Sequence, residues 1–288
     1  MSAIVRVPAA GWNPSLPTAD GVAMLERGAV IFLPETAFDL STVERAIFSP
    51  AVAAGAKNVS FDPANGTLRG TALQGSERDV LRQTLDRFSR LARQLAERLL
   101  PSYAAHLMTA RASFRPVEIA GRATSWRKDD TRLHVDAFPA TPVQGRRILR
   151  VFSNVNPDGR ARVWNVGDRF EAVATRFAPR LRLPWPGSAA IRQVLRLTKT
   201  ARSPYDALML QLHDRMKTDA DFQATSPHER FEFPSGATWL AFTDAVSHAA
   251  TSGQYQFEQT FLLPVATMED ERQSPLRILE RLKGRRLA

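Results

Sequence analysis

The feature that most constrains the fold is an amphipathic segment that runs from Ser76 to Leu100 and ends before Pro101. Most of its apolar residues lie three or four positions apart: Val80, Leu81, Leu85, Phe88, Leu91, Leu95 and Leu99. This spacing predicts a long helix with one apolar stripe, because residues so spaced lie on a single helix face. The stripe must be covered by a sheet or by other helices, so a second layer is expected.

The rest of the chain supplies short extended segments that can form such a layer. Period-two or continuous apolar patterns bounded by turn signals predict strands at 29–33, 146–155, 231–233, 238–243 and 255–263. The Asn65-Gly66 pair predicts a hairpin-like element over 60–73. Further helices are expected at 19–28, 168–182 and 187–223, and Ser41 with Glu44 forms a capping box that predicts another helix start. The pattern is therefore that of a mixed α and β protein.

The composition excludes several classes of protein and of site. The chain has 288 residues and no cysteine, which rules out a disulfide scaffold, a thiolate metal site and a cysteine nucleophile. With 39 Lys and Arg against 29 Asp and Glu, its formal charge of +10 favours nucleic acid, anionic lipid or acidic small molecules as partners. The known sequence signatures of nucleic-acid binding are absent, so no nucleic-acid partner is expected. Without a signal-peptide pattern or an apolar run of membrane-spanning length, we expect a cytoplasmic protein.

Two of the five histidines indicate a metal site. His134 and Asp136 lie two residues apart beside a strand signal, so in an extended chain both side chains point to the same side. His248 follows the predicted strand 238–243. Two imidazoles and one carboxylate that leave other positions open form the facial triad of non-haem Fe(II) oxygenases, the alternative being a structural histidine near a surface aspartate. The remaining histidines are expected to be structural: His106, His213 and His228.

At these residues the region 110–265 resembles the Fe(II)/2-oxoglutarate-dependent dioxygenases, whose double-stranded β-helix carries His-x-Asp near its start and a second histidine on a late strand. Within that superfamily, segments 125–157 and 204–223 are similar to the hydroxylases of 3-deoxy-D-manno-oct-2-ulosonic acid (Kdo). The resemblance implies an α+β fold with a jelly-roll (cupin-like) core and flanking N-terminal and inserted helices. We expect a single domain over 1–288.

The resemblance also suggests boundaries within this domain. An N-terminal portion would cover 1–109, and the jelly-roll core would cover 110–265 with a helical insert at about 168–223. A basic tail would follow at 266–288.

The same resemblance implies the cofactors and their ligands. Fe(II) would be held by His134, Asp136 and His248, with 2-oxoglutarate and O2 as cosubstrates. Many such enzymes clamp the distal carboxylate of 2-oxoglutarate with an Arg about ten residues after the second histidine, but this chain has Glu258 there. The strand 146–155 offers Arg146, Arg147 and Arg150 instead. Strand parity favours Arg150, which shares a face with Asn154, so these two are the expected cosubstrate contacts, with a surface arginine as the alternative.

The expected reaction is hydroxylation of Kdo at C3, giving Ko with release of succinate and CO2. The acceptor would be the Kdo sugar of a lipopolysaccharide precursor, Kdo2-lipid A, and its carboxylate calls for a basic rim. The candidates for that rim are Arg122, Arg127, Lys128 and Arg132.

The tail at 274–288 places leucines at helical spacing among basic residues. It could contact the anionic cytoplasmic face of the inner membrane, or it could dock on the protein's own core or fray. Two other functions remain open at this point: a 2-oxoglutarate-dependent hydroxylase of another small acidic metabolite or lipid, and a basic protein that binds nucleic acid or anions without catalysis.

Overall fold

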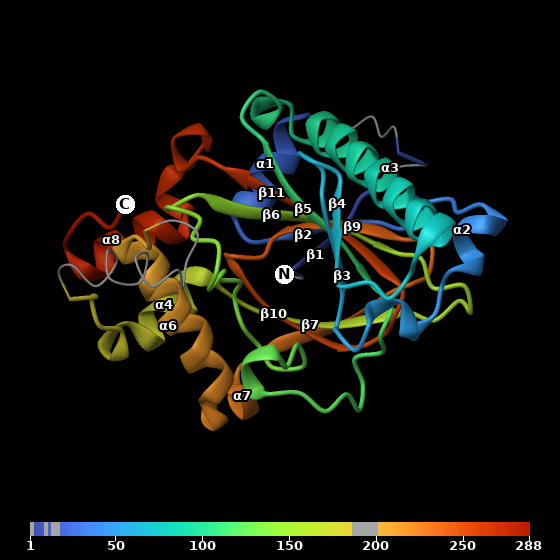
Figure 1. Cartoon of the computed structure of the whole chain (residues 1–288). Coiled ribbons are helices and arrows are strands. Elements are labelled where there is room, and N and C mark those ends of the chain that lie inside the picture. The colour runs from blue at the N-terminus through green and yellow to red at the C-terminus, as the bar shows by residue number, and fades with distance from the viewer. Residues whose placement is uncertain (1–2, 9–10, 13–17, 186–200) are drawn as a thin grey trace.

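The computed structural model describes residues 3–8, 11–12, 18–185 and 201–288, and it contains two facing β-sheets (Figure 1). The large sheet has the strand order β1 (Ile4–Arg6), β2 (Val30–Leu33), β9 (Thr238–Phe242), β6 (Arg147–Asn154), β11 (Gln256–Leu263), β5 (Met108–Arg115), β3 (Val59–Asp62) and β4 (Thr67–Arg69). The small sheet has the order β10 (Val246–Ser252), β7 (Arg162–Arg169) and β8 (His228–Phe233). All pairs are antiparallel except β1 with β2. This is the double-stranded β-helix that the resemblance implied.

One layer of helix covers the outer face of the large sheet. The long helix α3 (Gly75–Leu99) lies across β3, β5 and β11, as Figure 1 shows. Its stripe is buried in the main core, where Phe88 packs against Phe257 of β11 with ring centroids 5.3 Å apart. The helix α1 (Thr18–Glu26) lies beside α3, and α2 (Thr42–Ala46) begins at the capping box of Ser41 and Glu44. The expected covering layer for the amphipathic helix is therefore the jelly-roll sheet itself.

A second apolar cluster fills the space between the two sheets at one end. Trp239 and Phe152 from the large sheet stack at 5.4 Å, and Phe233 of the small sheet stacks on Trp239 at 4.0 Å. Trp164 of β7 meets Phe152 edge to face at 5.0 Å. Aromatic pairs of this kind stabilise beyond their buried area and hold the sheets at a fixed separation. The space between the sheets that this cluster leaves open becomes the functional cavity.

The N-terminal residues contribute strands to the same sheet as the rest of the chain. The hairpin predicted at 60–73 forms as β3 and β4, and Gly66 in its turn has φ +69°, a value that glycine adopts without strain. Residues 1–109 therefore complete the jelly-roll sheet through four of its strands. Short 3₁₀ turns join the larger elements: Pro50–Ala53, Pro101–Tyr103, Trp126–Lys128, Ala178–Arg180, Val265–Thr267 and Glu271–Gln273.

The helical prediction at 168–182 began too early, because the preceding strand was missed. β7 continues to Arg169, and α4 (Phe170–Phe177) starts only there. The prediction at 187–223 is borne out by α6 (Pro204–Thr218) and α7 (Ala220–Thr225), while its portion at 187–200 lies outside the described residues. α6 begins with its own capping box, in which Ser203 and Asp206 bond reciprocally.

The basic C-terminal segment docks on the protein itself. Helix α8 (Pro275–Lys283) buries Leu276, Ile278 and Leu279, and the backbone N–H of Tyr205 donates to the carbonyl of Leu287 at 3.1 Å. Of the alternatives for this segment, docking on the core is the one observed. In the part of the chain that the structure describes, no helix has the length and apolar content needed to cross a bilayer.

Candidate active site

The two expected histidine ligands face each other because their backbones pair. His134 and His248 form an isolated antiparallel bridge in which each backbone N–H donates to the other's carbonyl, at 3.0 and 2.9 Å. His248 lies on β10, whereas His134 lies in the segment between β5 and β6, where its neighbour Leu133 is held by hydrogen bonds. The side-chain amide of Gln223 accepts from the Leu133 N–H and donates to the Leu133 carbonyl, both at 2.9 Å. Both backbone polar groups of Leu133 are therefore hydrogen-bonded, which fixes the position of the neighbouring His134.

Each imidazole is oriented by the backbone carbonyl of the residue two positions earlier in the chain. Nδ1 of His134 lies 2.7 Å from the carbonyl of Arg132, and Nδ1 of His248 lies 3.0 Å from the carbonyl of Val246. A carbonyl only accepts, so both Nδ1 atoms carry hydrogen and both Nε2 atoms keep a free lone pair. Burial lowers the pKa of both imidazoles and keeps them neutral, which is the form that binds a metal.

The third ligand completes a group with metal-binding geometry. The ligand atoms of His134, Asp136 and His248 all lie within 4.8 Å of one another, and Nε2 of His134 is 3.9 Å from Oδ1 of Asp136. Oδ2 of Asp136 is buried and accepts no well-formed hydrogen bond, although Nη1 of Arg150 lies 3.3 Å away. Burial alone would raise the pKa of this carboxyl, but the nearby Arg150 guanidinium lowers it. The residues present therefore suit a divalent ion bound by two nitrogens and one oxygen.

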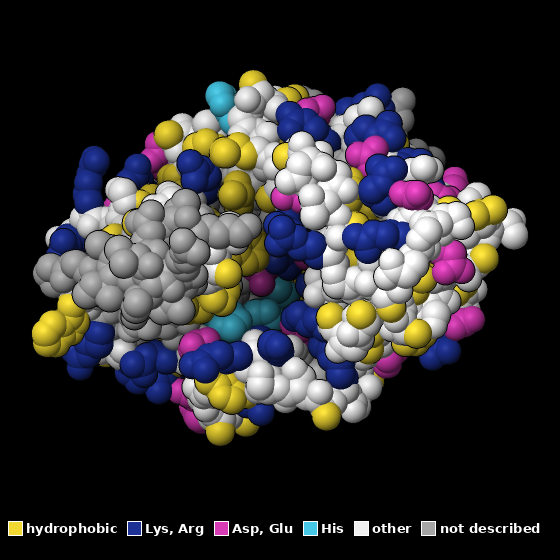
Figure 2. All heavy atoms as spheres, in the orientation of Figure 1, with side chains coloured by type: hydrophobic (Ala, Val, Ile, Leu, Met, Phe, Trp, Pro, Cys, Tyr) yellow, Lys and Arg dark blue, Asp and Glu magenta, His cyan; other side chains and the backbone are white. Residues whose placement is uncertain are grey.

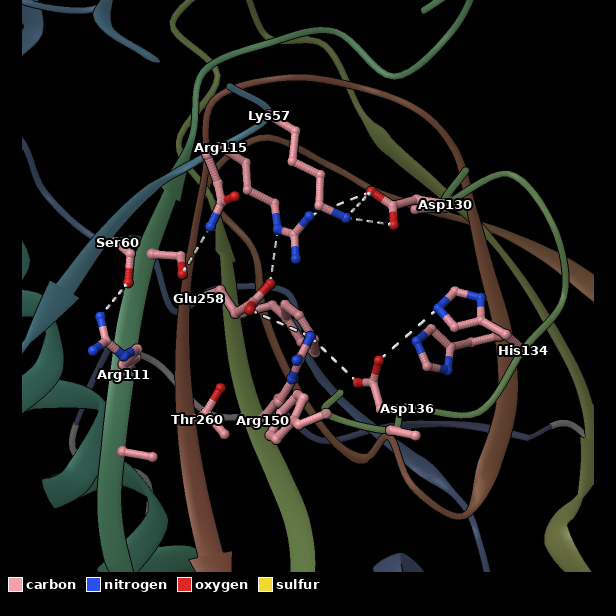
Figure 3. Close-up of a pocket in the computed structure, with 18 of the residues that line it drawn as sticks. Lys57, Ser60, Arg111, Arg115, Asp130, His134, Asp136, Arg150, Glu258 and Thr260 are labelled. Carbon is pink, nitrogen blue, oxygen red and sulfur yellow. Dashed lines mark hydrogen bonds and ion pairs between the residues drawn. The ribbon is translucent and has the colours of Figure 1, made fainter. Parts of the chain in front are cut away.

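The triad opens into a cavity of about 620 Å³ between the sheets. Figure 2 shows histidine side chains at the bottom of a hollow whose rim carries Lys and Arg side chains. In Figure 3, His134 and Asp136 lie on one side of the cavity, while Ser60 and Arg111 lie on the opposite side. Cavities of this size accept small ligands and position them by a few polar groups.

A network of charges spans the floor of the cavity. Arg150 of β6 contacts both Asp136 and Glu258, each at 3.3 Å, and Nε of Arg115 donates to Glu258 at 2.8 Å (Figure 3). Lys57 and Arg115 both approach Asp130, at 3.0 and 3.4 Å. Glu258, which stands where many dioxygenases have an arginine, is thus the anion that holds two arginines in place.

The structure brings only some of the predicted binding residues to the cavity. Arg150 and Arg127 line it. Asn154 is buried away from it and is used in the fold, since its amide donates to the carbonyls of Arg160 and Phe233 at 2.9 and 3.0 Å.

Three of the four predicted rim residues are not among the residues that line the cavity: Arg122, Lys128 and Arg132. Arg122 pairs with Asp130 at 3.3 Å, and Arg132 pairs with Asp129 at 3.0 Å. Lys128 is exposed in the turn at Trp126–Lys128.

Other residues of the cavity were missed by sequence reasoning. Arg162 of β7 and Lys217 of α6 line it while being almost fully buried, 2% and 1% exposed. His213, which was expected to be structural, also lines it, with its ring 5.4 Å from the ring of His134. The only sequence signal available was helical spacing, since His213 and Lys217 are one turn apart on α6.

Comparison with known proteins places this geometry in a family. Residues 12–286 match the family model described as 3-deoxy-D-manno-oct-2-ulosonic acid (Kdo) hydroxylase. No curated protein matches the chain.

Solved structures of the Kdo hydroxylase KdoO, described as a non-heme Fe(II) alphaketoglutarate-dependent dioxygenase, are similar over 99% of this chain and 97% of theirs. The structure with cobalt(II) has 42% identity and TM-score 0.96, that with alphaketoglutarate and Fe(III) 41% and 0.95, and that with succinate and Fe(III) 40% and 0.95. The chain belongs to the Kdo hydroxylase family of non-haem Fe(II)/2-oxoglutarate-dependent dioxygenases.

Proposed function

We propose that the protein hydroxylates C3 of a Kdo sugar on a lipopolysaccharide precursor, with Fe(II), 2-oxoglutarate and O2, and releases succinate and CO2. The observation that carries the proposal is the group of His134, Asp136 and His248, whose ligand atoms lie within 4.8 Å of one another. This group lines a cavity of about 620 Å³ in a chain that belongs to the Kdo hydroxylase family. Bound Fe(II) would supply the oxidative chemistry that couples decarboxylation of the cosubstrate to hydroxylation of the acceptor.

The chain's own contribution is to orient the ligands and to control water. The carbonyls of Arg132 and Val246 fix which imidazole nitrogen faces the metal, and Arg150 keeps Asp136 ionised. Trp164 stacks on His248 with ring centroids 5.1 Å apart and forms an apolar wall beside the triad. A wall of this kind holds the ring orientation and limits the access of water to the reacting centre.

Two arginines are candidates for the distal carboxylate of 2-oxoglutarate. Arg150, the choice from the sequence, already faces two carboxylates, Asp136 and Glu258. Among the residues that the structure describes, Arg162 has no carboxylate within ion-pair distance, and its Nη1 donates to the carbonyl of Gly253 at 2.7 Å. Burial lowers the pKa of Arg162 to about 9, so a cosubstrate anion there would relieve an unbalanced charge. On this ground Arg162 is the clamp, and Arg150 holds Asp136 and Glu258.

The acceptor is proposed to be Kdo2-lipid A, presented at the anionic cytoplasmic face of the inner membrane. Two observations support contact with that surface: Trp185 is 86% exposed, and the basic residues Arg285 and Arg286, which follow α8, are exposed. Burial of the apolar face of α8 means that this contact would use surface charge and Trp185 rather than an inserted helix.

The test is oxygen incorporation into Kdo2-lipid A, followed by mass spectrometry with Fe(II), 2-oxoglutarate and O2. A gain of one oxygen on Kdo, in step with succinate release, is expected from the wild-type protein and not from His248→Ala. Fragmentation places the new oxygen, and a product modified elsewhere than C3, or no product, would refute the proposal. Co-flotation with vesicles that contain anionic lipid, compared with neutral vesicles, tests the membrane contact separately.

A further inference from the structure

The cavity holds more positive than negative charge. Seven Lys and Arg side chains line it against four Asp and Glu side chains, and one of the four is the metal ligand Asp136. Five of the cations have an acidic partner no further than 3.6 Å away: Lys57, Arg111, Arg115, Arg127 and Arg150. Several of these pairs are drawn in Figure 3. Within the described part of the chain, Arg162 and Lys217 are the two lining cations without such a partner.

Lys217 is held in a way that leaves its charge unbalanced. Its Nζ donates to the carbonyl of Arg127 at 3.1 Å, and an ammonium has two further donors. The residue is 1% exposed, and burial lowers its pKa. An ammonium out of water without an anion beside it is costly, so this position is suited to an anionic group that arrives from outside the chain.

The two unbalanced cations lie on different sides of the triad. Arg162 is on β7 two residues from Trp164, whose ring stacks on His248. Lys217 is on α6 one turn from His213, whose ring contacts His134 at 5.4 Å. The first belongs to the jelly-roll sheets, and the second belongs to the inserted helices.

We propose that Lys217 binds the carboxylate of the acceptor sugar and so selects an acidic sugar as substrate. The inference rests on the proposed function, in which two organic anions, the cosubstrate and the acidic sugar, occupy the cavity together. Each then meets one unbalanced cation, Arg162 for the cosubstrate and Lys217 for the acceptor. His213 lines the same cavity and lies one helical turn from Lys217 on α6.

The experiment compares an acidic with a neutral acceptor. Turnover is measured with Kdo2-lipid A in detergent and with the same lipid after its Kdo carboxylates are converted to carboxamides. The variants are Lys217→Met, which keeps length and removes charge, and Lys217→Gln. Arg215→Met is the matched control, because it removes a positive charge from the same helix at a position that does not line the cavity.

The wild type and Arg215→Met should prefer the acid over the carboxamide in kcat/KM by about 30-fold or more, as expected for a lost charge-assisted partner. Lys217→Met and Lys217→Gln should lower this ratio to near one while 2-oxoglutarate affinity, measured by anaerobic calorimetry, stays near that of the wild type. A purely structural role would lower turnover on both acceptors equally and keep the ratio, which would overturn the inference. Loss of 2-oxoglutarate affinity in the variants would overturn it too, by assigning Lys217 to the cosubstrate. No product from the wild type with either acceptor would instead refute the proposed function.

Discussion

Replacing Arg162 by methionine tests the assignment of the cosubstrate clamp. Arg162 is 2% exposed, and its Nη1 donates only to a backbone carbonyl. Burial, together with repulsion from Arg115, lowers the pKa of Arg162 to about 9, so a carboxylate placed beside the guanidinium stabilises its charged form. Truncating one member of a buried charged pair usually costs about 2 to 5 kcal/mol, or about 30-fold to 5000-fold in affinity.

The substitution should therefore act in opposite directions on binding and on stability. In Arg162→Met, 2-oxoglutarate affinity should fall at least about 30-fold, because the distal carboxylate loses its partner. The unliganded protein should keep or gain thermal stability, because a desolvated charge has been removed. Iron affinity should stay near that of the wild type, since Arg162 forms no ion pair or hydrogen bond with His134, Asp136 or His248 in the described part of the chain.

The assay is anaerobic calorimetry of 2-oxoglutarate binding to the Fe(II)-loaded protein, with thermal unfolding of each variant. Arg160→Met is the control, since Arg160 lies on the turn before β7, is exposed and pairs with Asp158. Arg150→Met is the competing variant and should change iron binding, because Arg150 lies 3.3 Å from Asp136. If Arg162→Met bound 2-oxoglutarate as tightly as the wild type and Arg150→Met did not, the clamp would be Arg150 and the charge argument would be wrong.

Three further outcomes follow from the geometry. Alanine at His134, Asp136 or His248 should abolish Fe(II) binding, measured by metal analysis after dialysis. Circular dichroism should show that the variants remain folded. If one variant retained stoichiometric iron, the assignment of the replaced residue as a metal ligand would be wrong. Asp244→Asn should destabilise the protein by about 3 to 5 kcal/mol in denaturant unfolding, because it leaves the fully buried Arg147, now 2.8 Å from the Asp244 carboxylate, without a counter-charge. Burial lowers the pKa of both expected histidine ligands, so protons compete with iron only below the usual histidine pKa of about 6.5. Iron affinity should therefore be constant from pH 8 to about 6.5 and decrease at lower pH. A decrease in iron affinity that began above pH 7 would contradict this expectation.

The elements with strong local patterns could be predicted from the sequence. Helix α3 follows from its apolar spacing, and the hairpin of β3 and β4 follows from Asn65-Gly66. β7 was missed, and the helix after it was started too early. Gly167 and Asp168 of β7 are poor strand formers, and this strand forms because it pairs with β8 on one side and β10 on the other.

The triad could be found from the sequence because its chemistry is partly local. His134 and Asp136 are two residues apart, and an extended backbone turns that spacing into a shared face. His248 was predicted from its place after the expected strand 238–243, whereas its pairing with His134 across 114 positions of the chain is a tertiary fact.

The sequence by itself indicated the class of the fold, predicted the metal ligands and determined the excess of positive charge. It did not determine which of the many basic residues act at the cavity. Arg122 and Arg132 precede His134 closely but pair with Asp130 and Asp129. Arg162 and Lys217 come from distant elements and, among the described residues, have no acidic partner within ion-pair distance. The reason is physical: local spacing sets the direction of a side chain, but burial and the presence of a counter-charge depend on segments that only the folded chain brings together. The tertiary structure alone therefore decided which cations line the cavity without an acidic partner among the described residues.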